Sequence, residues 1–266
     1  MRIALMIEGQ EGVTWPQWVA LAQAAEAAGV EALFRSDHYS TVTGRGGGSL
    51  DAWTTLAGLA AATTRLRLGT LVSPVTFRHP SVLARAVVTA DHISGGRVEL
   101  GMGAGWMERE HEAFGFPFPP HAERAALLAE QIEIVHRQWT EDGFSFQGRF
   151  YELSDCEALP KPVQRPHPPL LVGGKGRRRT LEVAARWADE YNAFHVDPDV
   201  FVGLRERLDE ALVAVGREPG SVRLSLMTPL DGWSAELSRA YEAVGVERVF
   251  LQHFDHENLG PVERLG

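Results

Sequence analysis

The chain alternates between short apolar runs and longer amphipathic segments along almost its whole length, and this alternation limits the folds it can adopt. Helical spacing of apolar residues follows most of the short runs. Strands that alternate with helices are typical of parallel sheets, because each helix returns the chain to the same end of the sheet. Eight strands are expected, over residues 2–7, 32–35, 66–72, 97–101, 170–172, 190–194, 222–227 and 248–252. We therefore predict an α/β protein, a (β/α)8 TIM barrel that forms a single domain over residues 1–266.

One region departs from the alternation. Between Gly103 and Pro169 we expect a helix over 122–139, a small hairpin over 144–151 and a proline-rich crossing, which form an insertion after the fourth strand. A doubly wound sheet is the structural alternative, but the turn after the first strand lacks the Gly-x-Gly-x-x-Gly spacing of a nucleotide-binding fold. The last strand is followed only by a short helix, expected over 258–265, so that side of the barrel should be thinly covered.

Composition and charge exclude several classes of function. The single cysteine, Cys156, cannot build a disulfide framework or a zinc site with several thiolates. A net charge of −9 argues against binding to nucleic acid, whose phosphates would be repelled. No run approaches the roughly 18 apolar residues of a membrane helix, which argues against a membrane partner, and the N-terminus lacks the apolar core of a secretory signal. We expect a cytoplasmic protein.

Residues that could do chemistry gather after the predicted strands, where the active sites of TIM barrels lie. Asp37 and His38 follow the second strand and are candidates for acid–base chemistry or for holding a cofactor, although for the pair alone a surface turn is the favoured explanation. The other strand ends carry Ser73-Pro74, Gly101–Trp106, Gly173–Thr180, His195, Thr228 and His253.

The segment from Gly173 to Thr180 has the features of an anion site. Its glycines let the backbone approach a ligand, and the helix that follows presents free N–H groups, which attract anions. Lys175 and the three arginines at 177–179 add positive charge. The segment is not a Walker P-loop, because the Gly-Lys-Ser/Thr ending is missing. Phosphate binding is the favoured interpretation, and a flexible loop with solvated arginines is the alternative.

Two further patterns allow more than one interpretation. The alternating glycines from Gly101 to Gly105 either let a flat ring lie against the strand or form a tight turn, and Trp106 either stacks on a ligand or caps the barrel. Glu108, Glu110, His111 and Glu112 lack the spacing of a His-Glu-x-x-His zinc helix, so we predict a solvated charged face and no metal site. Cys156 has no local support as a nucleophile.

Taken in order, these segments resemble the luciferase-like flavin-dependent monooxygenase superfamily, and within it the oxidoreductases that use the deazaflavin coenzyme F-420. The resemblance covers residues 1 to about 255. The motifs that carry it are Ser36-Asp37-His38, the run 68–74, Arg78-His79-Pro80, the run 94–106, Pro160-Lys161-Pro162, Pro166, Pro168-Pro169 and Val172-Gly173-Gly174.

The resemblance implies a barrel of the bacterial luciferase type with the cofactor ring at its C-terminal face. It implies a bulge with a non-proline cis peptide at Leu71-Val72 that presses on the back of the ring. Asp37 would hydrogen-bond the ring, and His38 would donate or accept a proton. Gly103, Ala104, Gly105 and Trp106 would line the ring, and the phosphate would be held by Gly173, Gly174, Lys175, Gly176, Arg177 and Arg178.

The function expected from the resemblance is F-420-dependent hydride transfer to or from a small organic substrate. The acidic oligoglutamate tail of F-420 suits the arginine cluster, whereas FMN has no such tail. An FMN-dependent monooxygenase that uses O₂ and reduced flavin is the alternative. A phosphosugar isomerase or aldolase and a non-catalytic flavin-binding protein are more distant alternatives.

Three more expectations accompany the resemblance. Sugar-phosphate oxidation is not expected, because this chain has Val42 and Trp106 where those dehydrogenases have a tryptophan and a glutamate. The glycine-rich segment 41–49 is expected to be a mobile lid edge. Many members of the family dimerise, and we expect a homodimer.

Overall fold

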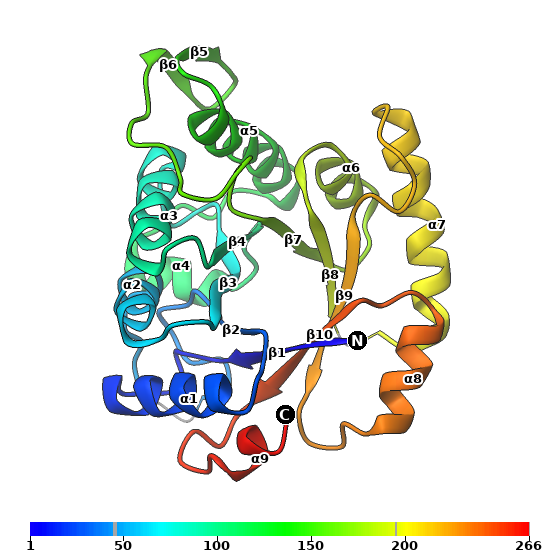
Figure 1. Ribbon diagram of the computed structural model, residues 1–266. Coiled ribbons are helices and arrows are strands. Elements are labelled where there is room, and N and C mark those ends of the chain that lie inside the picture. The colour runs from blue at the N-terminus through cyan, green and yellow to red at the C-terminus, as the bar shows by residue number, and fades with distance from the viewer. Residues whose placement is uncertain (45–46, 195, 266) are drawn as a thin grey trace.

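The structure is a computed structural model that describes residues 1–44, 47–194 and 196–265. Its parallel strands close into a barrel in the order β1-β10-β9-β8-β7-β4-β3-β2 (Figure 1). The barrel strands are β1 (Arg2–Ile7), β2 (Ala32–Arg35), β3 (Arg67–Pro74), β4 (Val98–Gly103), β7 (Leu170–Gly174), β8 (Glu190–Phe194), β9 (Arg223–Pro229) and β10 (Arg248–His253). The first and last strands pair in parallel, so the predicted TIM barrel is confirmed and the doubly wound alternative is wrong.

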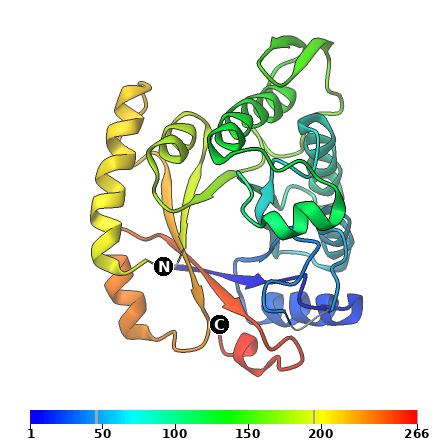
Figure 2. The same ribbon diagram turned by 180° about the vertical axis from the view of Figure 1, so that it is seen from behind.

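Helices surround the barrel, with α1 to α3 on one side and α7 and α8 on the other (Figures 1 and 2). They are α1 (Trp15–Ala27), α2 (Ala52–Ala62), α3 (Pro80–Ser94), α4 (Glu108–Phe114), α5 (His121–Thr140), α6 (Arg178–Trp187), α7 (Pro198–Ala214), α8 (Ala235–Ala243) and α9 (Gly260–Glu263). Helix α7 illustrates the packing, because its four buried residues are apolar and recur every three or four positions: Phe201, Leu204, Leu208 and Leu212.

The hydrophobic core has two parts. The larger part lies between the strands and the helices, and the smaller lies inside the barrel. Inside, Phe34 and Phe250 meet edge to face at 4.9 Å between ring centres, beside Met6 and Leu171. Within the described residues, apolar side chains therefore fill the inside of the barrel.

The insertion after β4 contains α4, α5 and a hairpin of β5 (Phe144–Gln147) and β6 (Glu152–Cys156). The predicted hairpin ended too early, because Gly148 donates to the carbonyl of Tyr151 and these residues form the turn. Cys156 therefore lies in the second strand and not after the hairpin. The hairpin lies beside α5, at the edge of the molecule (Figure 1). The last helix, α9, is shorter than predicted and packs against α1.

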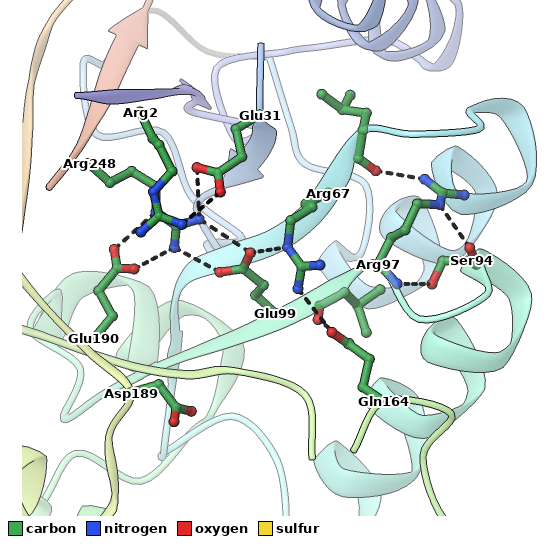
Figure 3. A network of polar contacts seen from close by, with 12 residues as sticks. Arg2, Glu31, Arg67, Ser94, Arg97, Glu99, Gln164, Asp189, Glu190 and Arg248 are labelled. Atoms are coloured by element: carbon green, nitrogen blue, oxygen red, sulfur yellow. Dashed lines mark hydrogen bonds and ion pairs between the residues drawn. The ribbon is translucent and has the colours of Figure 1, made fainter. Parts of the chain in front are cut away.

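The amino ends of the strands are joined by a buried ion network (Figure 3). Arg248 is fully buried, and its guanidinium lies 2.7 Å from carboxylate oxygens of both Glu99 and Glu190. Arg67 also donates to Glu99, and Arg223 donates to Glu190. Burial alone would raise the pKa of Glu99, but the attraction of Arg248 and Arg67 outweighs it and lowers the pKa to about 2. The network lies at the end of the barrel that serves stability.

Candidate functional site

A cavity of about 780 Å³ opens at the carboxyl ends of the strands. Every barrel strand contributes a residue from its carboxyl-terminal part or from the position just after it. These residues are Glu8, Ser36, Val72, Gly103, Gly173, Asn192, Met227 and Gln252. The volume lies within the range of small-molecule and cofactor sites, and the position is where TIM barrels bind their ligands.

Most of the residues predicted for the site line this cavity. They are His38, Leu71, Val72, Gly103, Ala104, Gly105, Trp106, Gly173, Gly174, Lys175 and Arg177. Asp37, Gly176 and Arg178 are not among the described residues that line it. His195, noted at the end of β8, lies outside the described residues.

The wall of the cavity bulges at Leu71-Val72, whose peptide bond is cis. The register between β3 and β4 shifts between Thr70 and Ser73. A Cβ on Gly101 would lie 2.1 Å from the Thr70 carbonyl oxygen, and one on Gly103 would lie 2.5 Å from Val72 Cγ2. These glycines therefore leave room for the bulge. This role differs from both interpretations of the glycine pattern, a flat ring against the strand and a tight turn.

Asp37 supports the wall from behind. Its side chain is buried, and its Oδ2 accepts hydrogen bonds from Ser73 Oγ at 2.7 Å and from Arg78. Arg78 continues to Asp51 at 2.7 Å, which ties the end of β2 to the start of α2. The expectation that Asp37 touches a cofactor ring gains no support from this position, because the carboxylate serves these internal donors.

His38 faces the cavity with 14% of its side chain exposed. Its Nδ1 lies 2.8 Å from Oε2 of Glu110 on α4, and its ring meets the Trp106 ring edge to face at 5.7 Å. The other carboxylate oxygen of Glu110 accepts hydrogen bonds from the backbone N–H groups of Tyr39 and Ser40. Helix α4 thus holds both the side chain and the following backbone of His38.

The solvated face predicted for α4 is wrong at two of its positions. Glu110 and His111 are buried, whereas Glu108 and Glu112 are exposed. Helical spacing could have predicted their burial. Positions 110 and 111 come three and four residues after the buried Met107, so they share its face of the helix. Charge alone suggested solvent, but the helix covers the cavity and turns these two side chains inward.

The environment of Glu110 keeps it ionised. Burial would raise the pKa of this carboxyl group. The hydrogen bond from His38 and those from the Ser40 and Tyr39 backbones outweigh burial and lower the pKa. His111, its neighbour, is held by the Met107 carbonyl at Nδ1 and by Thr76 Oγ1 at Nε2.

One rim of the cavity is cationic. Lys175, Arg177 and Arg179 line it at the start of α6, whose first turn has no side-chain cap. His121 and Arg124, from the start of α5, line it as well and were missed by the sequence analysis. Burial, together with the nearby guanidinium of Arg177, lowers the pKa of His121. Within the described residues, neither Lys175 nor Arg177 has a carboxylate partner.

Two of the loop residues predicted to hold phosphate, Gly176 and Arg178, do not line the cavity and contact other residues instead. The side chain of Arg178 is 92% exposed and pairs with Glu182 at 2.8 Å. Gly176 donates its N–H to the hydroxyl of the buried Tyr191 at 2.8 Å. Burial raises the pKa of Tyr191 to about 12, so this hydroxyl stays neutral and fixes the loop.

Several polar residues that line the cavity were also missed. Glu8 is 9% exposed and accepts hydrogen bonds from Gln10 at 2.8 Å and from Gln252. Asn192 donates to Ser225 at 3.0 Å. These residues come from strands far apart in the sequence, so no local pattern could group them.

No group of three or more His, Cys, Asp or Glu residues within the described ranges could hold a metal ion. No helix there is both long and apolar enough to cross a membrane.

Comparison with known proteins adds independent findings. The family model described as luciferase-like monooxygenase matches residues 2–251. The FMNH(2)-dependent dimethylsulfone monooxygenase of Pseudomonas putida is 34% identical over 64% of this chain and 46% of its own length. The F420-dependent glucose-6-phosphate dehydrogenase of Amycolatopsis mediterranei is 36% identical over 59% of this chain and 47% of its own. The chain thus spans about half the length of these curated relatives.

A solved structure extends the likeness to the whole fold. An F420-dependent secondary alcohol dehydrogenase, solved in complex with an F420-acetone adduct, superposes with a TM-score of 0.84. The match covers 98% of this chain and 96% of that chain at 15% identity, so it shows a shared fold.

Proposed function

The chain belongs to the luciferase-like monooxygenase family, and on that premise we propose that it is a flavin-type oxidoreductase that uses coenzyme F-420 to transfer a hydride to or from a small organic substrate. Of the two relatives compared, one is named for FMNH(2) and the other for F420. The family therefore supports a flavin or deazaflavin cofactor, and the choice between them rests on this chain's own residues.

The observation that carries the choice of F-420 is the cationic rim. Lys175 and Arg177 lack a carboxylate partner within the described part of the chain, and both line the cavity beside the uncapped start of α6. Free N–H groups at a helix start and unpaired cations favour a phosphate. Arg179 and Arg124 extend the positive rim beyond one phosphate, which suits a cofactor with an acidic tail better than FMN. His121 adds a neutral imidazole there, because its pKa is lowered.

The other wall residues fit a flat ring. When bound, the deazaflavin would supply a carbon that gives or takes a hydride. Leu71 and Val72 would support one face of the ring, and Gly103 and Ala104 would leave space along its edge. His38 would hold or accept the substrate's proton at Nε2. Trp106 would help to exclude water at the mouth.

Parallel titration of the purified protein with F-420 and with FMN tests the proposal. We expect tighter binding of F-420, and we expect Arg177→Gln and Lys175→Gln each to weaken it about tenfold, as for the loss of one charge-assisted hydrogen bond. Arg178→Gln is the matched control, because Arg178 is paired with Glu182 outside the cavity and its loss should leave affinity within about twofold.

Two results would count against the proposal. Equal losses of F-420 affinity in the Arg178 control and in the Arg177 variant would contradict the assignment of Arg177 to the phosphate. Binding of FMN alone, with turnover that requires O₂, would favour the alternative of an FMN-dependent monooxygenase, which the identity with the Pseudomonas putida enzyme supports.

Two of the more distant alternatives, a Schiff-base aldolase and a non-catalytic binding protein, gain no support from the structure. An aldolase of the Schiff-base type needs a lysine desolvated in the barrel. Lys175 lies exposed at the rim, and Lys161 donates to the carbonyl of Gln138 at the end of α5. A binding protein without catalysis would have no use for a cavity-facing histidine held by a buried carboxylate, as His38 is by Glu110.

A further inference from the structure

We propose that Glu110 is a positioning residue that fixes the tautomer of His38, so that Nδ1 carries the proton and the unprotonated Nε2 faces the cavity as a proton acceptor. The use of that acceptor in catalysis rests on the proposed function. The tautomer itself is a property of the free protein and can be measured without cofactor or substrate.

The argument starts from the hydrogen bonds of Glu110. Its Oε1 accepts from the backbone N–H groups of Tyr39 and Ser40, which fixes the orientation of the carboxylate. Its Oε2 then points to His38 Nδ1 at 2.8 Å. An ionised carboxylate can only accept hydrogen bonds, so the proton of this contact must lie on Nδ1.

The surroundings keep the imidazole ring in this orientation. The Trp106 ring lies edge to face against it, and only 14% of the side chain is exposed. A neutral imidazole with its proton on Nδ1 has its lone pair on Nε2. When a substrate O–H gives its proton to Nε2, the ring becomes an imidazolium, and the Nδ1–H bond to Glu110 becomes charge-assisted and stronger. Glu110 thus favours His38 as a base.

The substitution Glu110→Gln has a predictable consequence because the side chain keeps its shape. Tyr39 and Ser40 still present two N–H donors, so the amide oxygen must take the place of Oε1. The amide NH₂ then takes the place of Oε2 and points a donor at Nδ1. His38 can accept this hydrogen bond only if its own proton moves to Nε2. The variant should therefore present a donor to the cavity where the native protein presents an acceptor.

The ¹⁵N chemical shifts of the imidazole nitrogens, measured by long-range ¹H–¹⁵N correlation in the cofactor-free protein above pH 8, test this directly. A His38→Asn spectrum assigns the signal among the ten histidines. We expect a protonated Nδ1 in the native protein, a protonated Nε2 in Glu110→Gln, and the native pattern in Glu110→Asp, which restores a carboxylate. Glu112→Gln is the matched control, since Glu112 lies exposed on the same helix.

A protonated Nε2 in the native protein, or an unchanged tautomer in Glu110→Gln, would overturn the proposal. If the Gln variant fails to fold, the native spectrum still decides, because the proposal requires Nδ1–H there. Turnover adds a second arm: in the direction that removes a substrate proton, Glu110→Gln should lower kcat about 100-fold and leave KM nearly unchanged. Absence of F-420 binding would refute the proposed function and leave the tautomer result standing.

Discussion

At the scale of single residues, the cavity wall depends on where a side chain is missing. Val72 lies in the bulge, where the register of β3 shifts. Its side chain has space because Gly101, Gly103 and Gly173 have no Cβ. A Cβ on Gly173 would lie 3.0 Å from Val72 Cγ1. Three glycines on two neighbouring strands thus accommodate one bulge, which in turn shapes the site.

The bulge makes the effect of adding a methyl group predictable. Gly101→Ala should destabilise the protein by about 1–3 kcal/mol or more, because its Cβ would meet a backbone oxygen that cannot move aside. Gly203→Ala, in the middle of α7 with no atom closer than 3.5 Å, should instead stabilise the protein by up to about 1 kcal/mol. Urea unfolding of both variants measures the difference. Equal effects of the two substitutions would show that the bulge does not impose this constraint.

At the scale of elements, the segment Thr41–Thr43 is held over the cavity by one carboxylate. Glu11, after β1, accepts from Thr41 Oγ1 and from the Val42 N–H, both at 2.6 Å, and from Thr43. Burial would raise the pKa of Glu11, but these hydrogen bonds outweigh it and lower the pKa. Of the predicted lid edge over 41–49, residues 45 and 46 lie outside the described residues. Of the remaining positions, Thr41, Val42 and Thr43 hydrogen-bond to the Glu11 side chain, and Gly48 forms a backbone bridge with Glu11.

This contact predicts how ligand release depends on Glu11 and on pH. An amide can accept fewer of these hydrogen bonds, so Glu11→Gln should speed cofactor dissociation several-fold in stopped-flow measurements. Because the pKa is lowered when the contact is made, the native protein keeps the contact above the ordinary value near 4.5 and loses it as pH falls below. Glu210→Gln, on the exposed face of α7, is the control. Unchanged release from the Glu11 variant would mean that this segment does not gate the cavity.

At the scale of the whole molecule, the two ends of the barrel have different tasks. The amino ends of the strands are joined by the network around Arg248, whose carboxylate partners Glu99 and Glu190 are buried (Figure 3). The carboxyl ends carry the cavity and its partly exposed polar residues. Removing one partner of a buried ion pair leaves the other charge uncompensated, so this network should affect stability and leave the site intact.

Glu99→Gln tests this division. We expect a loss of about 3–5 kcal/mol in the free energy of unfolding at pH 7, with cofactor affinity unchanged in the folded fraction. The pKa of Glu99 is lowered to about 2, so its contribution is complete above about pH 4.5 and disappears as pH falls toward 2. The difference from the native protein should therefore narrow over that range. If the difference in the free energy of unfolding stayed constant with pH, the stabilising role of the Glu99 carboxylate would be contradicted. Glu133→Gln, on the partly exposed Arg137 pair, is the control.

The sequence allowed much of the site to be predicted because strand ends in a barrel converge. Residues such as Val72, Gly103 and Gly173 lie in the carboxyl-terminal parts of their strands, and eight strand ends meet around one opening. Glu110 escaped prediction because it lies on a helix of the insertion, and its partner His38 is 72 positions away. Glu8 and Gln252 met only when the first and last strands paired.

The sequence by itself therefore determined the number and order of the strands, since apolar periodicity and glycine-rich turns are local properties. It also determined which backbone segments lie at the carboxyl ends of the strands, because in a barrel this follows from strand order. Only the tertiary structure decided which of the charged side chains are partners. Asp37 pairs with Arg78, Glu110 with His38, and Arg248 with Glu99. The reason is physical. Burying an unpaired charge is unfavourable, and tertiary packing determines which oppositely charged side chain lies close enough to pair with it.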